Sequence, residues 1–145
     1  MALEDLYREV ILDHYRNPRN REPLAHPDRV AQGVNPLCGD EVTVELALDD
    51  GTVAGVSVHG QGCSISQSSG SMMSAAIKGK TRHEIEELIH GFKELMDIEG
   101  ADDAAPLSSD LGELEALRGV RRYPVRIKCA NLPWTTLAEA LENAG

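Results

Sequence analysis

Four side chains of this sequence have the chemistry to bind a metal ion together: Cys38, Asp40, Cys63 and Cys129. Cys38 and Asp40 are two residues apart, so both can point to the same side of an extended segment. Three thiolates and one carboxylate form a plausible tetrahedral zinc set, with bond lengths of about 2.0–2.3 Å. The spacing alone leaves unrelated buried thiols equally open, because the chain has no Cys-x-x-Cys pair.

The surroundings of the later cysteines favour ionised thiols. Cys63 precedes an expected helix, whose amide groups and dipole stabilise a thiolate. Arg126 and Lys128 come just before Cys129 and would lower the pKa of a thiol there. His59 is the nearest alternative ligand, but strand alternation places it on the face opposite the apolar residues, so it ranks below Asp40.

An expected β-hairpin brings the first three candidates together. The alternating segments Glu41–Leu48 and Thr52–His59 read as strands, separated by a turn signal at Asp50-Gly51. A two-residue turn would pair the apolar positions of one strand with polar positions of the other, so we favour a three-residue loop. That register faces Val42, Val44 and Leu46 with Ala54, Val56 and Val58. It places Cys38, Asp40 and Cys63 at the open end of the hairpin.

Helical patterns flank the hairpin. An amphipathic helix begins near Leu3 and is stopped by Asn17-Pro18, with His14 on its apolar stripe as a packed or partner-facing residue. A helix over Ser64–Lys80 ends near Gly79, and the capping box at 81–84 opens another, which runs to Met96. A last helix is expected over Leu132–Asn143, with Asn131 as its cap, Pro133 in its first turn and Trp134 as a partly buried anchor. We expect a single α+β domain over residues 1–145, with helices on one face of a small antiparallel sheet.

The composition limits the functional classes. The 145 residues carry a net charge of −10, which argues against nucleic acid or an anionic membrane as a partner. No apolar run reaches the roughly 18 residues of a membrane span, and the start of the chain does not look like a signal peptide. The 3 cysteines would leave one unpaired in any disulfide framework, which favours a reducing cytoplasm with metal-binding or reactive thiols.

Three segments together resemble the signatures of the IscU/SufU (NifU N-terminal-like) iron–sulfur assembly proteins. They are Asn35–Asp40 (Asn-Pro-Leu-Cys-Gly-Asp), Gly60–Ser66 (Gly-Gln-Gly-Cys-Ser-Ile-Ser) and Arg126–Cys129 (Arg-Ile-Lys-Cys). The resemblance extends over essentially the whole chain. It implies a three-stranded sheet, with Val30–Val34 as an additional strand that the pattern alone does not predict.

Two departures from the IscU branch bring the chain closer to SufU. Lys128 stands where scaffold-type IscU has histidine, and Arg122–Val125 (Arg-Tyr-Pro-Val) replaces the Leu-Pro-Pro-Val-Lys segment for chaperone recognition. The acidic stretch Ala101–Gly119 resembles the insertion that marks SufU, although on its composition it reads as a solvated loop. The resemblance therefore implies a zinc-bound sulfur-transfer protein that works with a SufS-type cysteine desulfurase and supplies later iron–sulfur assembly proteins.

In the mechanism that this resemblance implies, Cys38 accepts sulfur from the persulfide of the desulfurase, and Arg126 orients the partner or neutralises the developing thiolate. Two alternatives remain open. The same four residues could carry a [2Fe–2S] cluster as a scaffold, because thiolates suit both zinc and iron–sulfur clusters. The domain could also be a structural zinc adaptor, although structural zinc sites seldom use an aspartate.

Overall fold

The computed structural model describes residues 3–36, 39–96, 114, 116, 117, 120 and 123–142. Cys38 and nearly all of the acidic stretch Ala101–Gly119, for both of which the sequence makes predictions, lie outside these residues. The described elements, in chain order, are α1 (Leu3–Arg16), β1 (Arg29–Asn35), β2 (Asp40–Asp49), β3 (Thr52–Gln61), α2 (Ser64–Ile77), α3 (Arg82–Met96) and α4 (Pro124–Glu142).

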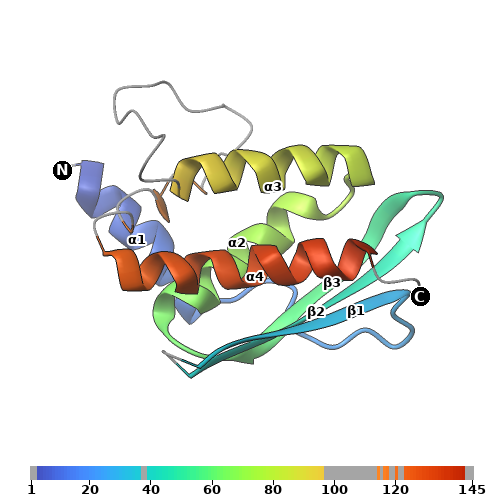
Figure 1. The fold of residues 1–145 in the computed structure, drawn as a ribbon, viewed down its shortest axis with the longest axis horizontal. Coiled ribbons are helices and arrows are strands. Elements are labelled where there is room, and N and C mark those ends of the chain that lie inside the picture. Colours follow the sequence, from blue (N-terminus) through green and yellow to red (C-terminus); the bar gives the residue numbers. More distant parts are fainter. Residues whose placement is uncertain are drawn as a thin grey trace.

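The strands form an antiparallel sheet in the order β1-β2-β3, and the helices lie on one side of it (Figure 1). α2 and α4 cover the sheet, α1 packs along α2, and α3 lies above α2 and α4. The α+β prediction is confirmed, and so is the additional strand that the family resemblance implied. The segment between α1 and β1 runs along the free edge of β3, where the N–H of Val58 donates to the carbonyl of Asn20 at 2.9 Å.

A β-bulge separates two registers in the hairpin. Near the turn, Asp49 pairs with Thr52, so the loop is the two-residue turn Asp50-Gly51, with φ of 53° and 80°. Beyond a shift next to Ala47, Val44 lies opposite Val58 and Leu46 opposite Val56. The predicted apolar pairing of the strand interiors is therefore right, but the three-residue loop is wrong. The prediction that Ala54 lies on the apolar face is wrong. Because of the bulge, Ala54 is exposed and Val53 is buried instead.

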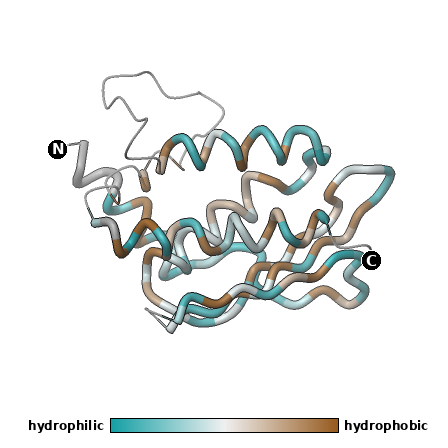
Figure 2. Tube along the Cα trace, in the orientation of Figure 1, coloured by the Kyte–Doolittle hydropathy of each residue, from teal (hydrophilic) through white to brown (hydrophobic). Residues whose placement is uncertain are grey.

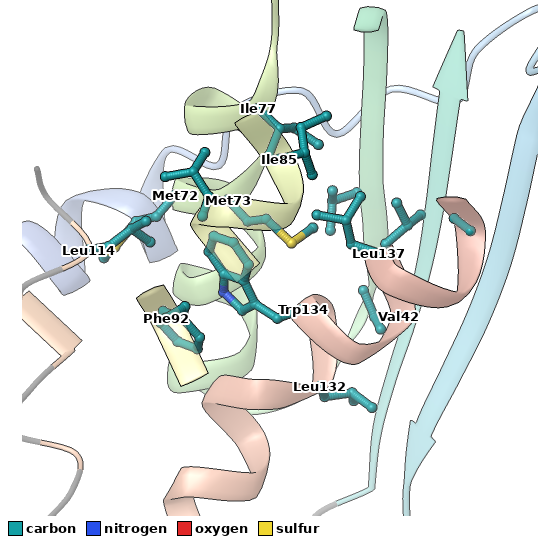
Figure 3. Packing of buried hydrophobic residues seen from close by; sticks show 14 of the residues in the cluster. Val42, Met72, Met73, Ile77, Ile85, Phe92, Leu114, Leu132, Trp134 and Leu137 are labelled. Carbon is teal, nitrogen blue, oxygen red and sulfur yellow. The ribbon is translucent and has the colours of Figure 1, made fainter. Parts of the chain in front are cut away.

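One hydrophobic core fills the space between the sheet and the helices. Val44, Leu46 and Val56 contribute to it from the strands, and Met73, Ile77, Ile85 and Leu137 contribute from the helices (Figure 3). Figure 2 shows α3 alternating between hydrophilic and hydrophobic stretches, as expected of a helix with one buried side. No helix among the described residues is long and apolar enough to span a membrane. The single domain over residues 1–145 stays a prediction.

The helix boundaries agree with the sequence except at the last helix. α1 ends at Arg16 and α2 at Ile77, and the capping box opens α3 through reciprocal hydrogen bonds between Thr81 and Glu84 at 3.1 and 3.2 Å. α4 begins at Pro124 instead of Leu132, so Asn131 is no cap and Pro133 lies inside the helix. The basic residues before Cys129 broke the apolar pattern, but they occupy the exposed first turns of this helix.

Trp134 is more deeply placed than predicted. Only 2% of it is exposed, and its ring stacks on Phe92 with centroids 4.5 Å apart (Figure 3). Its Nε1–H donates to Ser69 Oγ at 3.1 Å, and that hydroxyl donates to the carbonyl of Ala130 at 2.7 Å. The buried indole is possible because its polar atom has a partner. Ser69 thus fixes the position of α4 along α2.

Candidate metal centre

Asp40, Cys63 and Cys129 come together at the end of the sheet where β3 leads into α2, the lower left of Figure 1. A carboxylate oxygen and the two Sγ atoms all lie within 4.8 Å of one another. Asp40 begins β2, Cys63 directly precedes α2, and Cys129 lies in the second turn of α4. Three segments that are distant in sequence therefore contribute one donor each.

The two oxygens of Asp40 have different neighbours. The carboxylate is completely buried, and Oδ1 accepts a hydrogen bond of 2.8 Å from the backbone N–H of Cys63. Oδ2 lies 3.8 Å from Cys63 Sγ. This close approach requires glycine at position 62, because a Cβ there would overlap Oδ1 and lie 2.9 Å from Cγ. One oxygen thus holds the loop, and the other is available to a metal ion.

Cys63 occupies the N-cap position of α2, with φ −73° and ψ 168°. Its side chain forms no capping hydrogen bond in the described helix, so the sulfur stays available beside the positive end of the helix dipole. Ser66 Oγ donates to the carbonyl of Cys63 at 3.1 Å and lies 3.9 Å from its Sγ. The thiol of Cys63 is half-buried.

Cys129 is completely buried on the side of α4 that faces the sheet. Asn35, the last residue of β1 and itself 7% exposed, directs Nδ2 at Cys129 Sγ from 3.8 Å. The carbonyl of Val125 lies 3.9 Å from the same sulfur. Asn35 pairs with Asp40 in the sheet, so the strand register places the amide beside the donor cluster.

The geometry of the three donors fits a single tetrahedral ion. Zinc bonds of about 2.3 Å to sulfur and about 2.0–2.2 Å to oxygen set neighbouring donors roughly 3.5–3.7 Å apart. The 3.8 Å between Cys63 Sγ and Asp40 Oδ2 is close to that edge. Within the described part of the chain, no ion pair of a basic side chain reaches Asp40. A buried carboxylate and two thiols at these distances form a donor set that one divalent metal ion fits.

The other predicted site residues are placed as follows. Cys38 is outside the described residues, between the end of β1 and Gly39, which has φ +69°. Arg126 is exposed in the first turn of α4, three residues before Cys129. His59 contacts Glu45 at 3.1 Å on the opposite face of the sheet, in keeping with its lower rank as a ligand. The assignment of Cys38, Asp40, Cys63 and Cys129 as ligands stays a prediction.

Sequence reasoning missed Asn35 as a neighbour of the site. In the sequence it stands out only as the first residue of the Asn-Pro-Leu-Cys-Gly-Asp segment. A signal was present, because an alternating strand over 30–34 places position 35 on the same face as Ala31 and Gly33. A polar residue on the buried face of a strand requires a partner, and here the partner includes a cysteine sulfur.

Fold and site together define a small α+β domain with a carboxylate–thiolate cluster suited to one divalent ion. Residues 6–130 match the model of the NifU-like N terminal domain. The chain belongs to this family.

Three relatives illustrate the family. The zinc-dependent sulfurtransferase SufU of Bacillus subtilis (strain 168) is 43% identical over 139 residues, covering 96% of this chain and 91% of SufU. The iron–sulfur cluster assembly scaffold protein IscU of Streptococcus pyogenes serotype M1 is 36% identical, covering 98% and 86%. Among solved structures, the putative iron–sulfur cluster assembly scaffold protein for the SUF system (FiSufU) from Fervidobacterium islandicum AW-1 is 33% identical with a TM-score of 0.84, covering 97% of this chain and 100% of that one.

Proposed function

We propose that this protein is a zinc-dependent sulfurtransferase of iron–sulfur cluster assembly, which accepts persulfide sulfur from a SufS-type cysteine desulfurase. The observation that carries the proposal is the convergence of Asp40, Cys63 and Cys129 on one small volume. The similarity to a zinc-dependent sulfurtransferase over 96% of the chain supports zinc binding and sulfur transfer as the role of these residues. Iron–sulfur assembly proteins downstream would receive the sulfur.

Cys38, Asp40, Cys63 and Cys129 would hold the zinc ion. When bound, zinc keeps the thiols ionised at neutral pH and adds no redox chemistry of its own. The described donors are suited to permanent binding: Asp40 and Cys129 are completely buried, and the backbone of Cys63 is tied to Asp40. Cys38 comes from the connection between β1 and β2 and is the remaining thiol for chemistry.

The transfer step is a thiol exchange at a persulfide. The Cys38 thiolate attacks the outer sulfur of the desulfurase persulfide, a new S–S bond forms on Cys38, and the S–S bond of the desulfurase breaks. The desulfurase cysteine leaves as a thiolate, so no external oxidant or reductant is needed. Arg126, exposed at the start of α4, would orient the incoming negatively charged persulfide or the partner surface.

A cluster scaffold is the second candidate, favoured by the similarity to IscU over 98% of the chain. The donor distances argue for a single ion. A [2Fe–2S] cluster divides its four ligands between two irons, so among any three ligands at least two bind different irons and lie farther apart than ligands of one ion. Here all three described donors lie within 4.8 Å. Lys128 in place of the scaffold histidine agrees with this ranking.

Metal analysis and peptide mass spectrometry test the proposal. The purified protein should contain about one zinc, and incubation with a SufS-type desulfurase and cysteine should add sulfur to Cys38. Cys38→Ala should abolish this acceptance and retain the circular dichroism spectrum, whereas Tyr123→Ala, an exposed neighbour of α4, serves as a folding control. Persulfide transfer that survives in Cys38→Ala would overturn the assignment. A visible absorbance band after anaerobic reconstitution with iron and sulfide, without bound zinc, would establish the scaffold instead.

We also infer a cytoplasmic location. The support is chemical: this set of thiols works only in a reducing compartment, where the thiols are not lost to disulfides. The net charge of −10 opposes generic binding to nucleic acid or to anionic membranes. The partners of the protein are therefore expected to be other proteins of the assembly machinery.

A further inference from the structure

The three cysteines of the proposed site are chemically equivalent, so a structural feature must direct sulfur to one of them. The two described cysteines differ in their neighbours. Cys63 is half-buried at the helix N-terminus, whereas Cys129 is completely buried and receives a side-chain N–H from Asn35 at 3.8 Å. No role in the proposed chemistry has been given to this amide.

Asn35 places a side-chain amide in a buried position beside the donor cluster. The side chain is 7% exposed on the face of β1 that packs against α4, where Ala31 and Gly33 are its neighbours along the strand. A buried amide loses its hydrogen bonds to water and must replace them inside the protein. Its Nδ2 is directed at the sulfur of Cys129, which is a weak acceptor as a thiol and would be a stronger one as a metal-bound thiolate.

We propose that Asn35 is a positioning residue that keeps Cys129 bound and unreactive, so that the persulfide sulfur is delivered to Cys38. This inference rests on the proposed sulfurtransferase function. An N–H directed at a thiolate withdraws electron density from the sulfur and reduces its nucleophilicity. The same contact orients the thiolate toward the metal, as neighbours of metal ligands commonly do. Burial under α4 and the Asn35 contact act together on one sulfur.

The test uses Asn35→Leu, which keeps the volume of the side chain and removes the donor. Gln32→Leu is the matched control, because it makes the same change of amide to leucine on the exposed face of the same strand. The first readout is the sulfur-to-metal charge-transfer band of the cobalt-substituted protein. Without the N–H donor the sulfur electrons are less stabilised, so the band should move to longer wavelength in Asn35→Leu and remain unchanged in Gln32→Leu.

The second readout is the position of the transferred sulfur. After incubation with desulfurase and cysteine, peptide mass spectrometry should find sulfur on Cys38 alone in the wild type and on both Cys38 and Cys129 in Asn35→Leu. Zinc affinity, measured against a chromophoric chelator, should fall about 10-fold in the same variant. Asn35→Ala provides a second variant without the donor if the leucine disturbs the fold.

The outcomes separate this inference from the proposed function. A wild-type protein that fails to bind zinc or to accept sulfur on Cys38 overturns the function. A wild-type protein that does both, while Asn35→Leu and Asn35→Ala show an unmoved band and sulfur on Cys38 alone, overturns the role of Asn35. A charge-transfer shift distinguishes this role from mere packing, because packing alone does not alter the electrons of the sulfur.

Discussion

Replacing Gly62 by alanine should damage metal binding without unfolding the protein. The new Cβ would overlap Asp40 Oδ1 and lie 2.7 Å from Ser66 Oγ, closer than carbon and oxygen atoms normally approach. Asp40 is completely buried, so its carboxylate can move away only by giving up the 2.8 Å hydrogen bond from the N–H of Cys63. A hydrogen bond to a charged group contributes about 1.5–3 kcal/mol. Because 1.4 kcal/mol corresponds to a factor of ten, zinc affinity should fall about 10- to 100-fold.

The assay is competition for zinc with a chromophoric chelator at neutral pH. Gly55→Ala is the control, because it makes the same substitution earlier in β3, where the new Cβ would be in ordinary contact, 3.5 Å from Ala47 Cβ and 3.6 Å from Leu24 Cδ2. Both variants should keep the helical circular dichroism spectrum. The reasoning is refuted if Gly62→Ala binds zinc within about threefold of the wild type, because the carboxylate would then not depend on the backbone at position 62.

Three further predictions concern the fold. Ser69→Ala should lower the free energy of unfolding in urea by about 2 kcal/mol or more, because the Nε1–H of Trp134 and the carbonyl of Ala130 both lose a buried partner. Ser64→Ala, at the start of α2, is the control. Equal urea midpoints for the two variants would contradict the role of the Ser69 hydroxyl. Glu84→Gln should weaken the dependence of the free energy of unfolding on pH at acidic pH. The Thr81 N–H lowers the pKa of Glu84 below its usual 4.5, so its contribution is present above that pH and is lost as pH falls through the folded-state pKa. If the free energy of unfolding of Glu84→Gln depends on acidic pH as that of the wild type does, the role of Glu84 is contradicted. Chelation of the metal should retain the helical circular dichroism spectrum, because the core is formed by apolar side chains. It should lower Tm, because bound metal stabilises the folded state. Unfolding on chelation would identify a structural zinc domain instead.

The elements with a regular apolar period could be predicted from the sequence, because tertiary packing agrees with their local pattern. The alternation of Val42, Val44 and Leu46 predicted β2 and its partners, and the capping box predicted the start of α3. The start of α4 could not be predicted, since basic residues fill its first turns and Pro133 suggests a first turn farther along. Its helical state depends on contacts with α2 and the sheet, which local propensity does not report.

The donor cluster was partly accessible from strand pairing. The hairpin register alone brings Asp40 next to Cys63, and the structure places the N–H of Cys63 on the carboxylate. The position of Cys129 did not follow from the pattern, because it depends on how α4 crosses β1 and β2. The contact between Asn35 and Cys129 could not be predicted for the same reason. It depends both on the register of β1 and on the position of α4.

The bulge next to Ala47 explains how the hairpin satisfies two requirements at once. The turn needs residues with positive φ, which Asp50 and Gly51 provide in a two-residue loop. With a uniform register, that loop would set apolar positions of β2 against polar positions of β3 all the way to the open end. One additional residue in β3 shifts the pairing, so Val44 meets Val58 and Glu41 meets Gln61. At the open end of the hairpin, the shift places Gly62 next to Asp40. Ala54 is the residue of β3 without a partner in β2, so its deletion should remove the bulge and leave the pairs on both sides unchanged. Asp40 then stays beside the N–H of Cys63, and zinc affinity in competition with a chelator should be retained. Loss of zinc binding in this variant would contradict the position of the bulge.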